Sequence, residues 1–200
     1  MAVTESAMVE SFLHVDARAD DAPWIREVTL TSASTEQARP HLSALLPIAA
    51  IRLNVPATDW RDAVRASGDA LVAGGITTPA YTDQMIAIVE QLGPYIVIAP
   101  GIALAHARPS DAVLRPGLSW VTLAQPVRFG HKDNDPVTLV VGLAAPDSSS
   151  HVQALATLAG LLEDRPRRET LLRAKTPKDV LAAIVEYERE YAADAVKGMP

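Results

Sequence analysis

The sequence predicts an α/β fold, a three-layer sandwich in which a mixed central β-sheet is flanked by helices on both faces. Two observations support this class. Segments with helical spacing of apolar residues lie before and after a middle region, and that region contains short apolar runs with the length of strands. The resulting order is two helices, four or five strands and three helices. We find no internal repeat in the sequence.

Length and composition predict the domain organisation. The chain has 200 residues, which is room for one ordinary domain and a tail. Residues 1–45 carry Asp-rich and Ser/Thr-rich pieces without a sustained apolar period, so we interpret them as an N-terminal extension of unassigned role. The domain is predicted over residues 46–192, and residues 193–200 form a C-terminal tail. Since 48% of residues are hydrophobic and only 4% are aromatic, the core is expected to be aliphatic.

Charge and motif content exclude several functions. The formal net charge of -6 is spread along the chain, without the Lys and Arg cluster that nucleic acid requires. The sequence has no cysteine, so thiolate nucleophiles and thiolate metal sites are excluded. Neither a signal peptide nor an apolar stretch of about 20 residues for a membrane span is visible, and we expect a cytoplasmic protein. Motifs for nucleotide phosphate loops, dinucleotides, zincins and α/β-hydrolases are also missing.

The first elements are predicted from caps and breakers. The apolar segment that starts at Ile48 is a candidate short strand. A helix is expected to follow, with Thr58 as its N-cap and Gly74–Gly75 as its stop. Thr78 is the expected N-cap of a second helix, because Pro79 suits the first helical position. This helix should end at the next Gly-Pro pair.

The middle and last elements are predicted in the same way. Strands are expected at residues 95–99, 102–107, 118–124 and 137–144. A helix should follow with Ser150 as its cap, because Ser150 and Gln153 have the spacing of a capping box. Two helices then close the domain, near residues 166–174 and 177–191, and Thr176 and Asp179 form a second capping-box pattern ahead of the last one.

His106 is the most informative residue of the sequence. On a strand that starts at Ile102, residues Ile102, Leu104 and His106 share one face, so the imidazole should emerge from the core at the end of the strand. Arg108 and Ser110 follow closely and could neutralise and bind an oxyanion. A neutral imidazole offers one lone pair and can accept a phosphoryl group without a separate base. A histidine at the core edge without chemistry is the alternative.

His151 is the second candidate, and a polar loop is a third. His151 would lie in the first turn of the helix capped by Ser150, where free N–H groups and the helix dipole attract phosphate. It could equally be a solvated first-turn residue.

The loop His131–Pro136 has oxygen ligands suited to Ca²⁺ or Mg²⁺, but it lacks a closing glutamate. A solvated turn is therefore favoured there, and no metal or organic cofactor is expected.

Several segments around these residues resemble one known family. The segment GPYIVIAPGIALAHARP, from Gly93 to Pro109, is similar to the active-site segment of mannitol/fructose-type IIA domains of the sugar phosphotransferase system (EIIA type 2). The ascorbate-specific IIA component is the nearest branch. Further matching segments are WRDAVRASGDALVAGG, VTLAQPVRFGHKDNDPV and SHVQALATLAGLLED. Together they cover about residues 47–190.

The resemblance implies a phosphoryl carrier with a three-layer fold. His106 would accept phosphate from the phosphocarrier HPr and pass it to a IIB component, which serves a membrane IIC permease. His151 matches the second active-site histidine of the family, which supports the phosphoryl group without carrying it. Arg108 lies in a segment similar to the ascorbate branch and would stabilise charge. The resemblance names no metal or cofactor.

Two departures from the family pattern lie beside the active histidine. The usual proline before it and glycine after it are replaced by Ala105 and Ala107.

A regulatory protein, whose phosphorylation state controls binding to a partner, is the alternative function, and an inert homologue is a third. The sequence leaves open the transported sugar and the oligomeric state, a homodimer included.

Overall fold

The computed structural model describes the backbone of residues 41–197, and the side chains of residues 148–154, 156 and 192–197 lie outside this description. The strands are β1 (Ile51–Val55), β2 (Val97–Ala99), β3 (Ile102–His106), β4 (Gly117–Val127) and β5 (Val137–Ala144). The helices are α2 (Leu42–Leu45), the 3₁₀ turn η2 (Ile48–Ala50), α3 (Trp60–Ala73), α4 (Pro79–Leu92), α5 (Ser148–Glu163), α6 (Arg165–Leu172) and α7 (Pro177–Lys197). The prediction of an extension over residues 1–45 lies largely outside the described residues.

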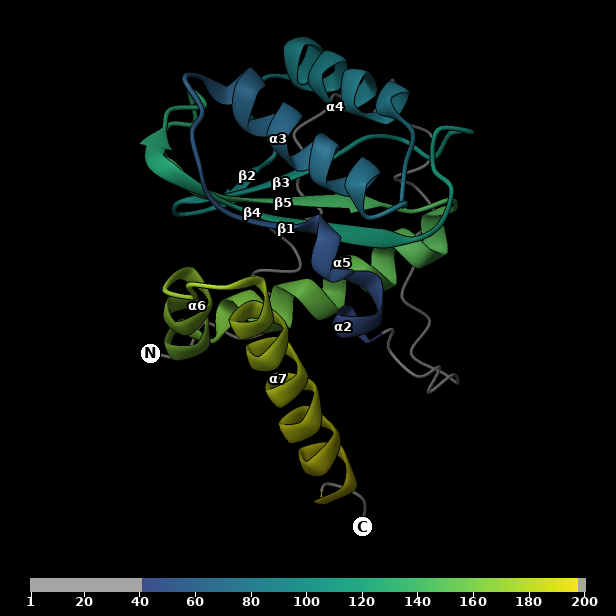
Figure 1. The fold of residues 1–200 in the computed structure, drawn as a ribbon, viewed down its shortest axis with the longest axis vertical. Coiled ribbons are helices and arrows are strands. Elements are labelled where there is room, and N and C mark those ends of the chain that lie inside the picture. Colours follow the sequence, from purple (N-terminus) through teal and green to yellow (C-terminus); the bar gives the residue numbers. More distant parts are fainter. Residues whose placement is uncertain (1–40, 198–200) are drawn as a thin grey trace.

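The strands form one mixed five-stranded sheet in the order β1-β4-β5-β3-β2. The pairs β1–β4 and β3–β5 are parallel, whereas β4–β5 and β2–β3 are antiparallel. Helices α3 and α4 cover one face of the sheet, and α2, α5, α6 and α7 lie on the other side (Figure 1). The predicted three-layer α/β sandwich is therefore confirmed. None of the helices within residues 41–197 has the length and apolar content needed to cross a membrane.

Small residues let helix α3 approach the sheet closely. The Ser67 and Ser119 hydroxyls lie 3.0 Å apart in the buried space between α3 and β4. Gly142 on β5 lies beneath them, and a Cβ atom there would come within 2.3 Å of the Ser119 Oγ. Helix α4 packs against α3 in a similar way, because a Cβ atom at Gly68 would lie 2.2 Å from the Thr82 Oγ1. Glycine is thus required at both places by space rather than by backbone angles.

Two of the predicted helix starts are confirmed. Helix α4 begins at Pro79 with Thr78 at the N-cap position. Before α7, the Thr176 N–H donates to the Asp179 carboxylate over 2.8 Å, and the Asp179 N–H donates to the Thr176 hydroxyl over 3.2 Å. These reciprocal bonds are the capping box that the sequence predicted.

Other predicted boundaries were wrong by one to three residues. The N-cap of α3 is Asp59, whose carboxylate accepts from the Asp62 N–H over 2.9 Å, while Thr58 bonds to the Asp62 carboxylate. Helix α5 begins at Ser148, so Ser150 lies within its first turn and is not its cap. Strand β2 starts at Val97 instead of residue 95, because the Val97 N–H bonds back to the Pro94 carbonyl in a turn.

Candidate functional site

His106 is the last residue of β3, at the edge where that strand leaves the sheet. It pairs with Leu143 of the parallel strand β5. The four preceding strand residues are buried, whereas His106 is partly exposed. The prediction that residues 102–107 form a strand with an accessible histidine at its end is therefore confirmed, with the strand ending one residue earlier.

The imidazole of His106 is anchored through one of its nitrogens. Its Nδ1 lies 3.0 Å from the backbone carbonyl of Leu104. Because a carbonyl oxygen only accepts, Nδ1 carries the proton in this contact and Nε2 keeps the lone pair. Burial lowers the pKa of His106 from its ordinary value, although the bond to Leu104 acts in the opposite direction. The ring is therefore neutral at pH 7, in the form that can act as a nucleophile.

A tyrosine from α4 holds the backbone that follows His106. The Tyr81 hydroxyl accepts from the Ala107 N–H over 3.1 Å and lies 2.9 Å from the Leu143 carbonyl and 3.1 Å from the Ala107 carbonyl. Burial raises the pKa of Tyr81 to about 12, so the hydroxyl stays protonated and can donate. Tyr81 therefore joins the ends of β3 and β5. Sequence reasoning missed it, although it lies one helical turn before the buried Met85.

A second tyrosine, Tyr95, contacts the imidazole directly. It lies in the turn before β2, and its ring meets the His106 ring edge to face, with centroids 5.6 Å apart and an interplanar angle of 77°. Burial raises the pKa of Tyr95 well above its ordinary value. The sequence placed Tyr95 in a strand and gave it no role, because ring contacts between separate segments leave no local pattern.

The structure treats the other predicted site residues differently. Arg108 is exposed just beyond β3, close enough to Tyr95 for its charge to counter part of the rise in that pKa. The Ser110 hydroxyl was expected to face an oxyanion, but it donates to the Gln84 side chain over 2.8 Å. His151 is the fourth residue of α5, and its side chain lies outside the described residues. A shared cleft between His106 and His151 therefore stays a prediction.

The loop considered as a metal site is organised by its own hydrogen bonds. The Asp135 carboxylate accepts from the Phe129 N–H over 3.0 Å and from the Gly130 N–H over 2.6 Å. The Nδ1 of His131 accepts from the Asn134 N–H over 3.1 Å. In the described part of the chain, no three His, Cys, Asp or Glu residues lie together as metal ligands. The loop thus has the character of a structural turn.

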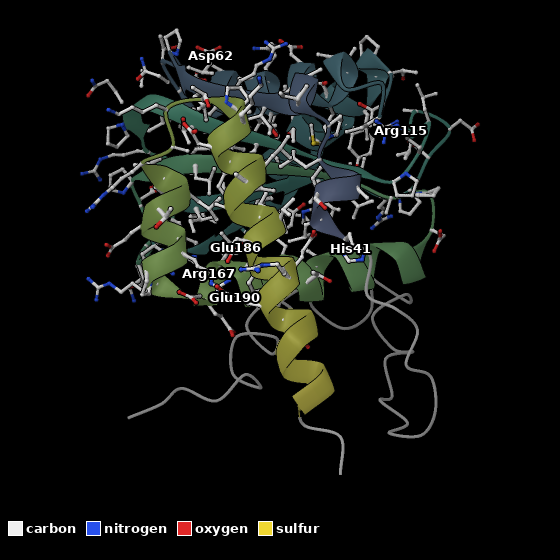
Figure 2. All side chains as sticks on the ribbon, turned by 60° about the horizontal axis from the view of Figure 1, so that its bottom comes forward. His41, Asp62, Arg115, Arg167, Glu186 and Glu190 are labelled. Carbon is white, nitrogen blue, oxygen red and sulfur yellow. The ribbon has the colours of Figure 1, made fainter. Side chains whose placement is uncertain are left out.

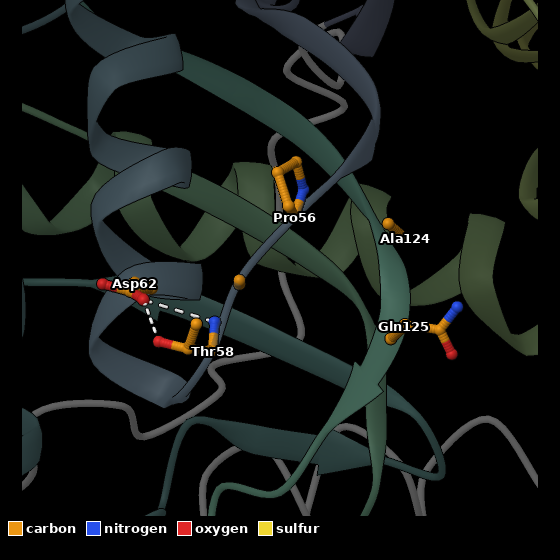
Figure 3. A pocket seen from close by; sticks show the side chains of 6 residues that line it. Pro56, Thr58, Asp62, Ala124 and Gln125 are labelled. Carbon is orange, nitrogen blue, oxygen red and sulfur yellow. Dashed lines mark hydrogen bonds between the residues drawn. The ribbon is translucent and has the colours of Figure 1, made fainter.

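A shallow pocket lies away from His106. Figure 3 shows it between α3 and β4, with the hydrogen bonds of Thr58 to Asp62 on one side. Its lining residues are Pro56, Ala57, Thr58, Asp62, Ala124 and Gln125. This lining offers no histidine, so the pocket is not a candidate for phosphoryl transfer.

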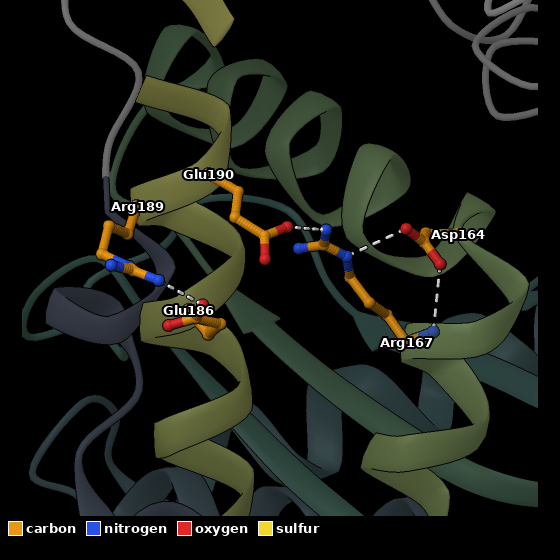
Figure 4. Close-up of polar contacts among 5 residues, drawn as sticks. All are labelled: Asp164, Arg167, Glu186, Arg189 and Glu190. Atoms are coloured by element: carbon orange, nitrogen blue, oxygen red, sulfur yellow. Dashed lines mark hydrogen bonds and ion pairs between the residues drawn. The ribbon is translucent and has the colours of Figure 1, made fainter. Parts of the chain in front are cut away.

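The charged clusters on the surface have structural contacts. Figure 4 shows Arg167 between Asp164 and Glu190, which joins α6 to α7, and a separate pair of Arg189 with Glu186. Arg115 lies away from this network (Figure 2) and donates to the Gly74 carbonyl at the end of α3 over 2.7 Å. These side chains stabilise helix ends and helix packing.

Comparison with known proteins identifies the family of this chain. Residues 16–187 match the family described as phosphoenolpyruvate-dependent sugar phosphotransferase system, EIIA 2. The chain is 40% identical over 135 residues to the ascorbate-specific phosphotransferase system EIIA component of Salmonella choleraesuis (strain SC-B67), covering 67% of this chain and 88% of that protein.

Two solved structures from Escherichia coli share the fold. The solution structure of the mannitol-specific cryptic phosphotransferase enzyme IIA CmtB is 33% identical, with a TM-score of 0.65 over 72% of this chain and 98% of that chain. Enzyme IIA of the mannitol system, solved in complex with phosphorylated enzyme IIB, is 29% identical, with a TM-score of 0.63 over 71% of this chain and 99% of that chain.

Proposed function

Because the chain belongs to the EIIA 2 family of the phosphoenolpyruvate-dependent sugar phosphotransferase system, we propose that His106 is the residue on which this phosphoryl carrier holds its phosphate. The observation that carries the proposal is the 3.0 Å contact between His106 Nδ1 and the Leu104 carbonyl. This contact directs the proton to Nδ1 and places the lone pair on Nε2, the nitrogen that can bond to phosphorus. His106 accepts phosphate from phospho-HPr and passes it to a IIB component.

The transfer needs few changes in the protein. The Nε2 lone pair of His106 forms a bond to phosphorus, while the bond from phosphorus to HPr breaks and its electron pair stays on HPr. The ring then carries a phosphoryl group on Nε2, a proton on Nδ1 and a positive charge. The Leu104 carbonyl dipole stabilises that charge through the existing hydrogen bond. In onward transfer a nucleophile of the IIB component forms a bond to phosphorus, while the bond from phosphorus to Nε2 breaks and its electron pair returns to Nε2.

Arg108 and His151 are the proposed stabilisers of the phosphoryl group. Arg108 extends from the segment after β3, and a guanidinium can neutralise phosphoryl oxygens by bidentate hydrogen bonds. His151 lies near the start of α5, where helix N–H groups favour a negative charge. His151→Ala should slow filling or onward transfer about tenfold to hundredfold, since a hydrogen bond to a charged group is lost.

The comparisons also support the class of partner and system. A related IIA enzyme is known in complex with phosphorylated IIB, which supports a IIB component as the acceptor. A relative covering most of the domain is named ascorbate-specific, which supports an ascorbate-type system. HPr as the donor and a IIC permease served indirectly are part of the proposal. The proposed carrier acts in the cytoplasm through a domain at residues 46–192. A homodimer stays a prediction that light scattering would test.

The test is phosphorylation with phosphoenolpyruvate, enzyme I and HPr. The protein should gain one acid-labile phosphoryl group on His106, and His106→Ala should abolish the gain. His41→Ala is the control, because His41 (Figure 2) is an exposed histidine before α2, and its Nδ1 lies 3.5 Å from the Glu188 carboxylate. Labelling of His106→Ala at the wild-type level, or phosphate mapped to His151, would contradict the assignment.

A further inference from the structure

The hydroxyl of Tyr95 is a buried polar group without a partner. Its oxygen is buried, and no hydrogen-bond partner for it is found in the described structure. Most buried hydroxyl groups in proteins are satisfied, because an unmade hydrogen bond costs folding stability. The rest of the side chain packs against the ring of His106. The unpartnered hydroxyl therefore belongs to the same site as the proposed phosphorylated residue.

Neighbouring charges and dipoles indicate the end of the sheet at which this hydroxyl lies. Its electrostatic neighbours are Tyr81 and Arg108. The Tyr81 hydroxyl is bonded to the backbone of Ala107, and Arg108 is the next residue along the chain. The Tyr95 hydroxyl thus lies at the end of β3 where His106 emerges. A phosphoryl group on His106 would bring three strong acceptor oxygens into this region.

We propose that the Tyr95 hydroxyl is a catalytic hydrogen-bond donor to the phosphoryl group on His106, a role that rests on the function proposed above. The donor is unsatisfied in the unphosphorylated protein and gains its acceptor when the phosphoryl group arrives. No proton is transferred, and the tyrosine remains neutral because burial opposes its ionisation. Tyr95 and Arg108 would then bind the phosphoryl oxygens together, one as a neutral donor and one as a cation.

This arrangement favours the phosphorylated state over the free state. A hydrogen bond that forms only with the phosphoryl group stabilises the phosphorylated protein and contributes nothing to the unphosphorylated protein. The unphosphorylated fold carries the cost of the unsatisfied hydroxyl. Phosphorylation should therefore stabilise the wild-type fold more than it stabilises a variant that lacks the hydroxyl.

Tyr95→Phe tests the role, because it keeps the ring contact with His106 and removes only the hydroxyl. The unphosphorylated variant should unfold at the same temperature as wild type or higher. Its phosphorylation by phospho-HPr should be about tenfold to hundredfold slower, which is the loss expected for one hydrogen bond to a charged group. The ³¹P chemical shift of its phosphohistidine should differ from that of wild type, because one oxygen has lost a donor.

Thr82→Val is the matched control. The Thr82 hydroxyl is also buried and unpartnered in the described structure, but it faces Gly68 of α3 instead of His106. This variant should keep the wild-type transfer rate and ³¹P shift. If Tyr95→Phe transfers at the wild-type rate with an unchanged ³¹P shift, or if Thr82→Val slows transfer equally, the inference is overturned. Failure of wild type to label on His106 would instead overturn the proposed function.

Discussion

Replacing Tyr81 by phenylalanine should lower the stability of the fold that supports the site. The ring would still fill its place beneath α4, but the hydroxyl contacts to the Ala107 N–H, at 3.1 Å, and to the Leu143 carbonyl, at 2.9 Å, would be lost. A buried N–H without a partner costs about 1 to 3 kcal/mol, and a lost donated bond costs about 1 kcal/mol. We expect the free energy of unfolding to fall by about 2 to 4 kcal/mol. For a chain of this size, this lowers the melting temperature by about 4 to 16 °C.

Urea and thermal unfolding of Tyr81→Phe would measure this loss, with Tyr191→Phe as the control. Tyr191 is 45% exposed, so loss of its hydroxyl should change the free energy of unfolding by no more than about 0.5 kcal/mol. The pH dependence gives a second readout. Since burial raises the pKa of Tyr81 to about 12, its contribution to stability is present below the unfolded pKa near 10 and is lost as the pH rises through 12. Equal stability of Tyr81→Phe and Tyr191→Phe would refute the reasoning.

Three further predictions concern titration, packing and capping. Because burial lowers the pKa of His106, the neutral imidazole contributes to stability above the unfolded pKa of 6.5, and this contribution is lost as the pH falls towards the folded pKa. In His106→Gln, the free energy of unfolding measured in urea should therefore depend less on pH between about pH 5 and pH 7. Gly142→Ala would place a Cβ atom 2.3 Å from the Ser119 Oγ and should cost about 1 to 3 kcal/mol in chemical denaturation, whereas Gly130→Ala meets no neighbouring atom and should show only backbone strain. Thr176→Ala removes the acceptor of the 3.2 Å bond from the Asp179 N–H and should lower thermal stability by about 1 kcal/mol, and an unchanged unfolding curve would contradict the capping role.

Local chemistry explains which elements the sequence could predict. Helix α4 was predicted correctly because Pro79 and Gly93 are strong signals for a start and a stop. The cap of α3 was misplaced by one residue because Thr58 and Asp59 are both good caps, and only the hydrogen bond to the Asp62 N–H distinguishes them. The strand order and the mixture of parallel and antiparallel pairs depend on contacts between distant segments, which one sequence does not reveal.

The same division applies to the candidate site. His106 could be found because alternation along one strand puts it at the end of an apolar run. Tyr81 could not be connected to it, since its hydroxyl meets Ala107 across 26 residues of chain. Ser110 was assigned to the phosphoryl group from its proximity in sequence, but its hydroxyl turns to Gln84 on α4. Proximity along the chain was therefore a poor guide to side-chain direction beyond the strand.

The anchor of the His106 ring is the main chain of its own strand. The acceptor is the Leu104 carbonyl, two residues earlier, so no single side-chain replacement can delete it. Surface residues around His106 can therefore change to suit different partner proteins while the reactive nitrogen keeps its orientation. Engineered or natural variants of this domain should be able to change the partner protein that they bind while the imidazole keeps the same orientation.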